Sequence, residues 1–285
     1  MHGSGNDYVY FDGTSEDLTA YDLTELAKIV SDRNFGVGGD GIILVLPSET
    51  ADFLMRIFNP DGSEPEMCGN GIRAFAKYAY EHGLTEKTEL LVQTGAGLIR
   101  PILTVRDGRV ASIRVDMGIP RLARSQIPMA GEPPTQHVVD EPLEVAGRTL
   151  RVTCVSMGNP HCVTFVDDVD EAPVTDLGPQ VENHPAFPAR TNVEFVEIVD
   201  RSNVKMRVWE RGVGETLACG TGASATLVAC VLNDLIPRGR TAQVALRGGV
   251  LEIEWADDDH VYMTGPATEV FSGELSEAIL SRARV

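Results

Sequence analysis

Two short segments of the sequence carry residues whose types and spacing could do chemistry: residues 68–71 (CGNG) and 219–222 (CGTG). Each follows a predicted strand and precedes a predicted helix, so Cys68 and Cys219 are expected at helix N-termini. The partial positive charge and free backbone N–H groups at such a terminus favour a thiolate over a thiol. The glycines let a substrate carboxylate approach the same N–H groups. The pattern predicts two reactive thiols, each beside an anion-binding turn.

Two equivalent thiols suit one kind of reaction in particular, which is stereoinversion at a carbon atom. One thiolate removes the proton next to a carboxylate, and the opposing thiol delivers a proton to the other face. Each positioned acid or base contributes a rate factor on the order of 10²–10⁴. Preorganised N–H donors would stabilise the carbanion that develops at the carboxylate.

The equivalence of the two segments is part of an internal repeat. The sequence MRIF at 55–58 recurs as MRVW at 206–209, an offset of 151 residues. At that offset Glu64, Cys68, Gly69, Gly71 and Ala74 fall on Glu215, Cys219, Gly220, Gly222 and Ala225. A second pair, residues 5–7 and 158–160, repeats at an offset of 153. We therefore predict two homologous halves, 1–117 with Cys68 and 118–263 with Cys219, joined in a proline-rich stretch.

The elements that must position the thiols follow from the hydrophobic pattern. Helical spacing predicts a helix over 17–32, and short apolar runs predict strands over 42–46, 55–58, 113–116, 151–155, 192–198 and 204–209. A further helix should follow each cysteine, with Asn70 and Thr221 as N-capping residue types. Gly83 and Pro237 are the stop signals of these two helices. Many strands with one long helix in each half predict an α/β or α+β fold.

Composition and charge exclude several other classes of protein. The formal net charge of −18 argues against nucleic-acid and membrane-surface partners. No apolar run approaches a membrane span of about 18 residues, and residues 1–7 show no secretion signal, so we expect a cytoplasmic protein. The five cysteines form no Cys-x-x-Cys pair and the histidines are scattered, so no disulfide framework and no metal site are predicted. The glycine-rich segment 36–41 lies between a helix and a strand, the reverse of a nucleotide-binding turn.

Taken together, the motifs resemble those of the diaminopimelate epimerase family, in order and over nearly the whole chain. The segments that carry the resemblance are 3–7 (GSGND), 35–40 (FGVGGD), 59–64 (NPDGSE), 67–71 (MCGNG), 157–161 (MGNPH), 191–193 (TNV), 209–212 (WERG), 218–222 (ACGTG) and 264–266 (TGP). The resemblance implies an epimerase independent of pyridoxal phosphate and of any other cofactor. Such an enzyme interconverts LL- and meso-diaminopimelate in lysine and peptidoglycan-precursor synthesis.

The same resemblance implies a fold and a set of site residues. The fold would be two pseudo-symmetric halves, each a curled, mostly antiparallel sheet around a central helix, with about 264–285 packing back on the first half and a homodimer as the assembly. Cys68 and Cys219 would be the acid/base thiols, and His161 and Glu210 would tune their pKa values. Substrate-binding residues would be Asn6, Asn59, Gly69, Asn70, Asn159, Asn192, Glu210, Arg211, Gly220 and Thr221.

Two positions depart from the family pattern, and two rival functions stay open. Many family members carry Gln where this chain has Gly41, so one substrate contact is expected to be replaced by water or backbone. The given sequence also starts at the Met of the first motif, whereas the family usually has a short strand before it, so either that strand is trimmed or the start site is mis-assigned. The nearest rival is a proline or hydroxyproline racemase, although these typically carry His at the position of Asn70. The other rival is a redox or ligand-binding protein in which Cys68 and Cys219 form a reversible disulfide. The remaining cysteines, Cys154, Cys162 and Cys230, are predicted to be core residues.

Overall fold

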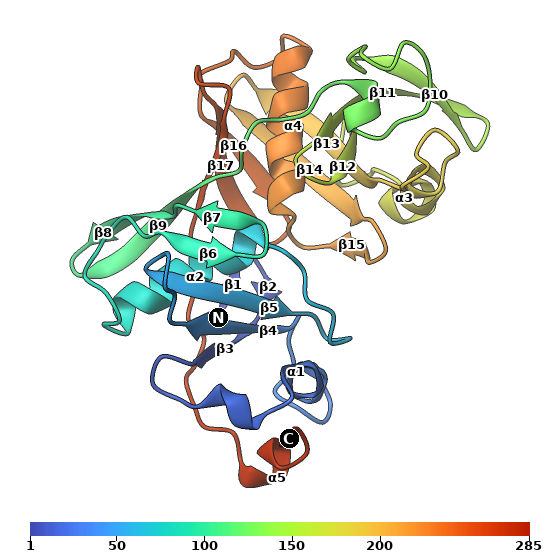
Figure 1. Cartoon of the computed structure of the whole chain (residues 1–285). Helices are drawn as coiled ribbons and strands as arrows, with labels where there is room; N and C mark the ends of the chain where they lie inside the picture. Colours follow the sequence, from blue (N-terminus) through green and yellow to red (C-terminus); the bar gives the residue numbers. More distant parts are fainter. The chain divides into compact units, whose positions relative to one another are not determined.

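The structure, a computed structural model, describes residues 1–285 and divides into two compact units (Figure 1). Unit 1 comprises Met1–Val115 together with Gly265–Val285, and unit 2 comprises Asp116–Thr264. No helix in it has the length and apolar character needed to cross a membrane. All five cysteines are free thiols.

Unit 1 is built on a five-stranded sheet with strand order β3-β4-β5-β6-β7, in which parallel and antiparallel pairs alternate. Two antiparallel pairs, β1 with β2 and β8 with β9, accompany it. The strands are β1 (His2–Gly3), β2 (Asn6–Asp7), β3 (Val9–Asp12), β4 (Ile42–Leu46), β5 (Phe53–Phe58), β6 (Val92–Thr94), β7 (Gly97–Ile99), β8 (Ile102–Arg106) and β9 (Arg109–Asp116). The helices are η1 (Leu18–Ala20), α1 (Leu23–Ser31), α2 (Gly69–Glu81) and α5 (Glu277–Leu280).

Unit 2 holds a longer, mostly antiparallel sheet with strand order β10-β11-β12-β13-β14-β16-β17-β18, and β15 pairs with β14 beside it. Its strands are β10 (Glu141–Val145), β11 (Arg148–Ser156), β12 (Pro160–Phe165), β13 (Asn192–Asp200), β14 (Asn203–Glu210), β15 (Gly214–Thr216), β16 (Ala242–Leu246), β17 (Gly249–Trp255) and β18 (Val261–Gly265). Its helices are η2 (Arg124–Gln126), α3 (Val174–Glu182) and α4 (Gly220–Leu232).

Helix α4 is the core of unit 2, because its sequence is apolar on every side. Residues 223–230 are all buried, as expected for a helix without a polar face. The helix contacts six strands, β11 to β14, β16 and β17, so the sheet curls around it (Figure 1). This arrangement confirms the predicted fold class, a mixed α and β protein with a curled, mostly antiparallel sheet and a central helix.

The structure repeats the internal offset found in the sequence. Helices α2 and α4 each have 13 residues, and both their first and last residues lie 151 positions apart. The ion pair between Arg56 and Glu64 of unit 1 (2.7 Å) recurs between Arg207 and Glu215 of unit 2 (2.8 Å), again at an offset of 151. Equivalent residues therefore occupy equivalent places around the two helices.

The last residues of the chain pack on unit 1. Arg73 Nε in α2 donates to the carbonyl oxygen of Pro266 (3.4 Å), and the carbonyl oxygen of Ala283 accepts from the backbone N–H of Asp22 (2.8 Å). Ala283 is 2% exposed and belongs to the apolar cluster that includes Leu26 and Phe58. Helix α5 lies beside α1 (Figure 1).

One predicted element is wrong in its extent. Instead of a helix over 17–32, the chain forms the short 3₁₀ turn η1 and then α1, which begins at Leu23. The physical reason is that Asp17 and Asp22 both act as N-caps: each carboxylate accepts backbone N–H groups of the residues that follow. A second cap within the predicted span starts a new helix rather than continuing the first.

Candidate active site

The two repeated cysteines cap the two long helices. Cys68 is the N-cap of α2 and Cys219 is the N-cap of α4, both with extended backbone angles. Each sulfur accepts the backbone N–H three residues on, from Gly71 at 3.4 Å and from Gly222 at 3.3 Å. The prediction that Asn70 and Thr221 cap these helices is wrong, because the cysteine side chains take that role and both residues lie inside the first turn.

The surroundings of Cys68 are neutral or cationic. Its thiol donates to Asn6 Oδ1 (3.3 Å), and the hydroxyl of Tyr8 donates to the sulfur (3.7 Å). Asn6 is held in turn by Asp40, whose carboxylate accepts from Asn6 Nδ2 (2.7 Å). Behind the helix turn lies the fully buried Arg73, which donates to the carbonyl oxygen of Gly69 (3.1 Å) and to Asn70 Oδ1 (3.0 Å).

The surroundings of Cys219 are acidic by comparison. Its sulfur lies 3.4 Å from Thr221 Oγ1, and the half-buried carboxyl group of Glu210 is within hydrogen-bonding reach of it. Glu210 also accepts a hydrogen bond from the hydroxyl of Thr216. The structure thus brings the predicted residues Thr221 and Glu210 to this thiol.

His161 joins the same cluster through Asn159. Asn159 Nδ2 donates to Thr221 Oγ1 (3.2 Å), and Asn159 Oδ1 lies 3.0 Å from His161 Nε2. The other ring nitrogen, Nδ1, lies 2.7 Å from Glu194 Oε1. His161 and Glu194 are both fully buried, so this contact is shielded from solvent.

Burial raises the pKa of both thiols above its ordinary value. At Cys68 the hydrogen bonds from Gly71 and Tyr8 and the charge of Arg73 oppose that rise. At Cys219 the carboxylates of Glu210 and Glu194 add to it, so its pKa lies well above the usual range. Burial likewise raises the pKa of Glu210. The backbone N–H groups at each helix N-terminus lower the thiol pKa, as expected, but desolvation of a buried charge outweighs them, so neither pKa is lowered overall.

Further predicted residues have partners within their own units. Asn192 Nδ2 donates to the carbonyl oxygen of Pro160 (2.8 Å), and its Oδ1 accepts the backbone N–H of Arg211 (2.9 Å). Asn192 therefore fixes the start of the loop that carries Arg211. Asn59 donates to Ser63 Oγ (3.0 Å) in a tight turn, and no side-chain hydrogen bond joins it to Cys68 or to the other predicted residues. Gly69 and Gly220 are the first residues of their helices.

Gly41, the departure from the family pattern, has a structural reason. Its φ of +145° is one that residues with a side chain rarely adopt, and a Cβ there would lie 2.2 Å from the carbonyl oxygen of Phe58. A glutamine side chain does not fit this backbone.

Three residues that the sequence reasoning missed touch the thiol clusters: Tyr8, Arg73 and Glu194. The signal for two of them was in the repeat. An offset of 153 places Tyr8 on His161, and an offset of 151 places Ile43 on Glu194. Arg73 gave no such signal, since its position within a helical pattern reads as an ordinary surface residue.

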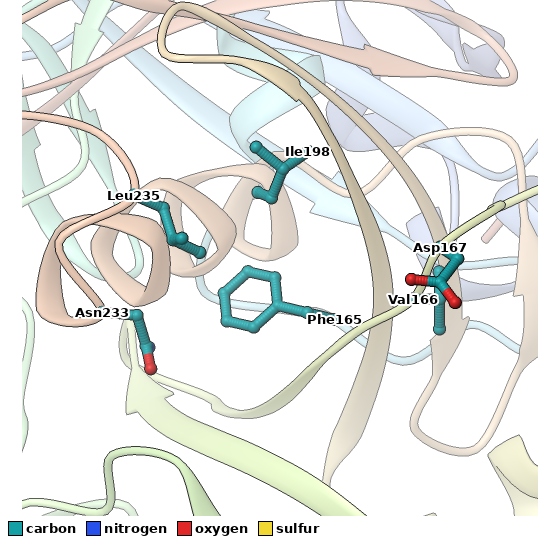
Figure 2. Close-up of a pocket in the computed structure, with 6 residues that line it drawn as sticks. All are labelled: Phe165, Val166, Asp167, Ile198, Asn233 and Leu235. Carbon is teal, nitrogen blue, oxygen red and sulfur yellow. The ribbon is translucent and has the colours of Figure 1, made fainter.

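One surface hollow of unit 2 lies away from the thiol. Figure 2 shows its lining, which consists of Phe165, Val166, Asp167, Ile198, Asn233 and Leu235. Asn233 is the C-cap of α4 whereas Cys219 is its N-cap, so about 20 Å of helix separates the two, at about 1.5 Å per residue. No group of three or more His, Cys, Asp or Glu side chains is placed to hold a metal ion.

Comparison with known proteins gives a consistent result. The family model described as diaminopimelate epimerase matches residues 1–123 and 153–270. A curated diaminopimelate epimerase of Moorella thermoacetica is 60% identical over 275 residues, covering 96% of this chain and 97% of the relative. Another, of Pelotomaculum thermopropionicum, is 56% identical over 273 residues, 96% of each chain.

Solved structures show the fold at much lower identity. A probable proline racemase from Agrobacterium radiobacter superposes with a TM-score of 0.66 at 17% identity, covering 97% of this chain and 91% of the other. A likeness at this level concerns the fold alone.

Proposed function

Since the chain belongs to the diaminopimelate epimerase family, we propose that it interconverts LL- and meso-diaminopimelate by proton transfer at the α-carbon, in lysine and peptidoglycan-precursor biosynthesis. The observation that carries the mechanism is the pair of cysteines, one in each unit, that cap equivalent helices at an offset of 151 residues. A reaction that turns one enantiomeric centre into the other needs one such group for each face of the carbon.

The proton balance of the reaction is simple. One thiolate takes the α-proton, so a C–H bond breaks and an S–H bond forms. The other thiol gives its proton to the opposite face of the carbon, so the second sulfur ends as the thiolate. Helix N-termini leave backbone N–H groups without intrahelical partners, and those of 69–70 and 220–221 would donate to the carboxylate and stabilise the carbanion.

The substrate-binding roles are part of the same proposal. Asn6 on the Cys68 side, and Asn159 and Glu210 on the Cys219 side, would hold the reacting amino and carboxylate groups, and their contacts in the two thiol clusters support this role. Asn70 and Thr221 belong to the two carboxylate cradles. Arg211 would pair with the distal carboxylate through its planar guanidinium. Asn59 and Asn192 complete the set by family resemblance, and His161 acts beside Cys219.

The test is solvent-deuterium incorporation. In D₂O without added cofactor, LL-diaminopimelate should gain deuterium at the α-carbon as the meso isomer forms. Cys68→Ser and Cys219→Ser should each lower the rate on the order of 10²–10⁴-fold. The fully buried Cys230, changed to Ala, is the matched control and should keep the rate.

Two outcomes would overturn the proposal. Turnover of L-proline or trans-4-hydroxyproline, with none of diaminopimelate, would make the protein a racemase of the rival kind. Full function of Cys68→Ser under reducing conditions would favour the redox hypothesis.

We also propose, on the family resemblance, that the enzyme needs no pyridoxal phosphate, acts in the cytoplasm and forms a homodimer. The equal offsets of helices, ion pairs and cysteines support two homologous halves, 1–117 and 118–263. Light scattering of the purified protein measures the assembly, and a monomer at micromolar concentration would contradict the dimer.

A further inference from the structure

Glu194 is a buried carboxylate for which the proposed mechanism has no use. It lies in β13 with no solvent exposure, and only one of its oxygens has a partner, because Oε2 is buried without a hydrogen bond. A buried carboxylate with one unsatisfied oxygen is costly. A function that requires this carboxylate would explain why the chain carries it despite its cost in stability.

The partner of its other oxygen begins a continuous path to Cys219. Oε1 lies 2.7 Å from His161 Nδ1, and His161 Nε2 lies 3.0 Å from Asn159 Oδ1. Asn159 Nδ2 donates to Thr221 Oγ1 (3.2 Å), which lies 3.4 Å from the Cys219 sulfur. Four contacts thus lead from the carboxylate to the thiol.

The chemistry of the groups along this path determines which atom donates in each hydrogen bond. An amide oxygen only accepts, so His161 Nε2 must carry a proton and donate it to Asn159 Oδ1. The amide nitrogen then donates to Thr221 Oγ1, which leaves the threonine hydroxyl proton free to point at Cys219. At the far end, one proton lies between His161 Nδ1 and Glu194 Oε1. Without a partner on Nδ1, the contact with Asn159 would be the only side-chain hydrogen bond holding the ring in this orientation.

The repeat shows that packing does not require a carboxylate at this place. Residue 43 is the equivalent of residue 194, and in unit 1 it is Ile43. A Cβ built on Gly71 would lie 2.7 Å from Ile43 Cδ1, and a Cβ built on Gly222 would lie 2.8 Å from Glu194 Oε1. The two side chains therefore fill the same space behind the two capping turns, one apolar and one acidic.

We propose that Glu194 is a positioning residue for Cys219: it holds His161 so that the Asn159 and Thr221 hydrogen bonds direct a hydroxyl proton at the sulfur. The proposal rests on the proposed function and adds to it a residue that touches no substrate. The positioning effect of Glu194 passes through the imidazole ring, and Asn159 and Thr221 connect that ring to the thiol.

The charge of Glu194 has a second effect at the same place. Together with Glu210 it raises the pKa of the Cys219 thiol, beyond the rise that burial causes. The groups facing this sulfur are those two carboxylates, the Thr221 hydroxyl and the backbone N–H of Gly222. His161 interacts with both carboxylates. Removing the charge should therefore lower the pKa of Cys219, while removing the positioning should lower the rate.

Two substitutions separate these effects. Glu194→Ile copies unit 1 and removes the hydrogen bond to His161 Nδ1, so kcat should fall on the order of 10- to 100-fold, with KM changed by less than about twofold. Glu194→Gln removes the charge, but its amide group can donate to Nδ1 and keep the proton on Nε2. This conservative variant should recover most of kcat. Glu197→Gln, on the same strand and paired with Lys205 at the surface, is the control and should behave like the wild type.

The independent readout is ¹⁵N NMR of the His161 ring, assigned with a His161→Gln sample. The wild type and Glu194→Gln should both show a protonated Nε2, whereas Glu194→Ile should show the ring nitrogens exchanging between tautomers. Unchanged kcat and an unchanged ring spectrum in Glu194→Ile would overturn the proposal. So would a loss of kcat in Glu194→Gln as large as in Glu194→Ile.

The readouts also keep this proposal apart from the proposed function. If the wild type fails to epimerise diaminopimelate, the proposed function is wrong, and the ring spectrum still reports whether Glu194 holds His161. If Glu194→Ile does not fold, as judged by thermal unfolding, the spectrum of Glu194→Gln decides. A lost Nε2 proton in that variant would overturn the proposal.

Discussion

Cys68 and Cys219 occupy the same place on their helices but have different neighbours. Around Cys68 the groups that set its pKa besides burial are the Gly71 N–H, the Tyr8 hydroxyl and the Arg73 guanidinium, all of which favour the thiolate. Around Cys219 two carboxylates oppose ionisation. The two thiols should therefore differ in reactivity, although sequence equivalence alone would make them alike.

This difference gives a prediction for the pH dependence of alkylation. Thiolate is the species that reacts, and both pKa values are raised, so both rates should increase as the pH rises above neutral. Cys68 should reach its full rate at the lower pH, because its neighbours oppose the effect of burial. Peptide mass spectrometry after iodoacetamide treatment measures both sites in one sample.

The same experiment contains its own controls. Burial raises the pKa of Cys230 to about 12, so this thiol should stay unmodified across the range. Tyr8→Phe removes a donor to the Cys68 sulfur and should slow alkylation of Cys68 several-fold without affecting Cys219. Modification of Cys219 at a lower pH than Cys68 would contradict the prediction that the nearby carboxylates give Cys219 the higher pKa.

At this scale the sequence predicted some of the site and missed the rest for identifiable reasons. The cysteines, Asn159 and Thr221 stand in glycine-rich turns, where polar residues are conspicuous. Glu194 stands inside an apolar strand, where a single acidic residue looks like a solvent-facing position. Only the folded chain shows that it points at the N-terminus of α4.

At the scale of elements, the two long helices end differently although they begin alike. Gly83 follows α2 with φ +73°, and at the equivalent position Asp234 follows α4 with φ +58°. A left-handed residue with a side chain costs about 1 kcal/mol relative to glycine. Asp234→Gly should therefore raise the free energy of unfolding by about 0.5–1 kcal/mol.

The matched change is Gly83→Ala, which should lower that free energy by about 1 kcal/mol. Nothing lies within 4 Å of a Cβ at Gly83, so backbone conformation alone decides the sign. Urea denaturation measures both variants. A shift of both midpoints in the same direction would show that the left-handed conformation is not the cause.

The elements were predicted well where the pattern is local. The run over 42–46 is found as β4, and the other five predicted strands all lie within longer observed strands. The helix over 17–32 was wrong because apolar spacing continues across Asp22, which starts α1 by capping it. Strand ends were missed because pairing with a neighbouring strand, and not the hydrophobic pattern, fixes where a strand stops.

At the scale of the whole molecule, the chain returns at its end to the first unit. The carbonyl oxygen of Ala283 accepts the N–H of Asp22, the residue that caps α1, and its methyl group packs in the cluster around Leu26. We predict that Ala283→Asp destabilises unit 1 by about 2–5 kcal/mol, because it buries a charge without a partner.

Thermal unfolding combined with limited proteolysis measures this effect. Cleavage should appear first in residues 265–285. The control is Val285→Asp, whose side chain is 91% exposed and should leave both measurements unchanged. Equal melting temperatures for wild type and Ala283→Asp would contradict the prediction.

The order of the motifs along the chain predicted the family, and the internal repeat predicted that each long helix carries a thiol. The sequence did not predict which neighbours distinguish the two thiols. That difference depends on long-range contacts, such as Tyr8 with Cys68 and Glu194 with His161, whose partners are 60 and 33 residues apart.

The exchange of Ile43 for Glu194 behind two otherwise matching turns has a consequence for reversible catalysis. In a two-base stereoinversion, the forward reaction starts from the free enzyme with one cysteine as thiolate and ends with the other cysteine as thiolate. The reverse reaction starts from the second form and ends with the first. The Haldane relation makes the ratio of the forward and reverse kcat/KM values equal to the equilibrium constant at every pH. The unequal sulfurs therefore cannot favour one product at equilibrium. The difference between the two sulfurs instead affects the rate at which the two free-enzyme forms interconvert. Substrate does not assist this step, so it must limit turnover when both stereoisomers are abundant.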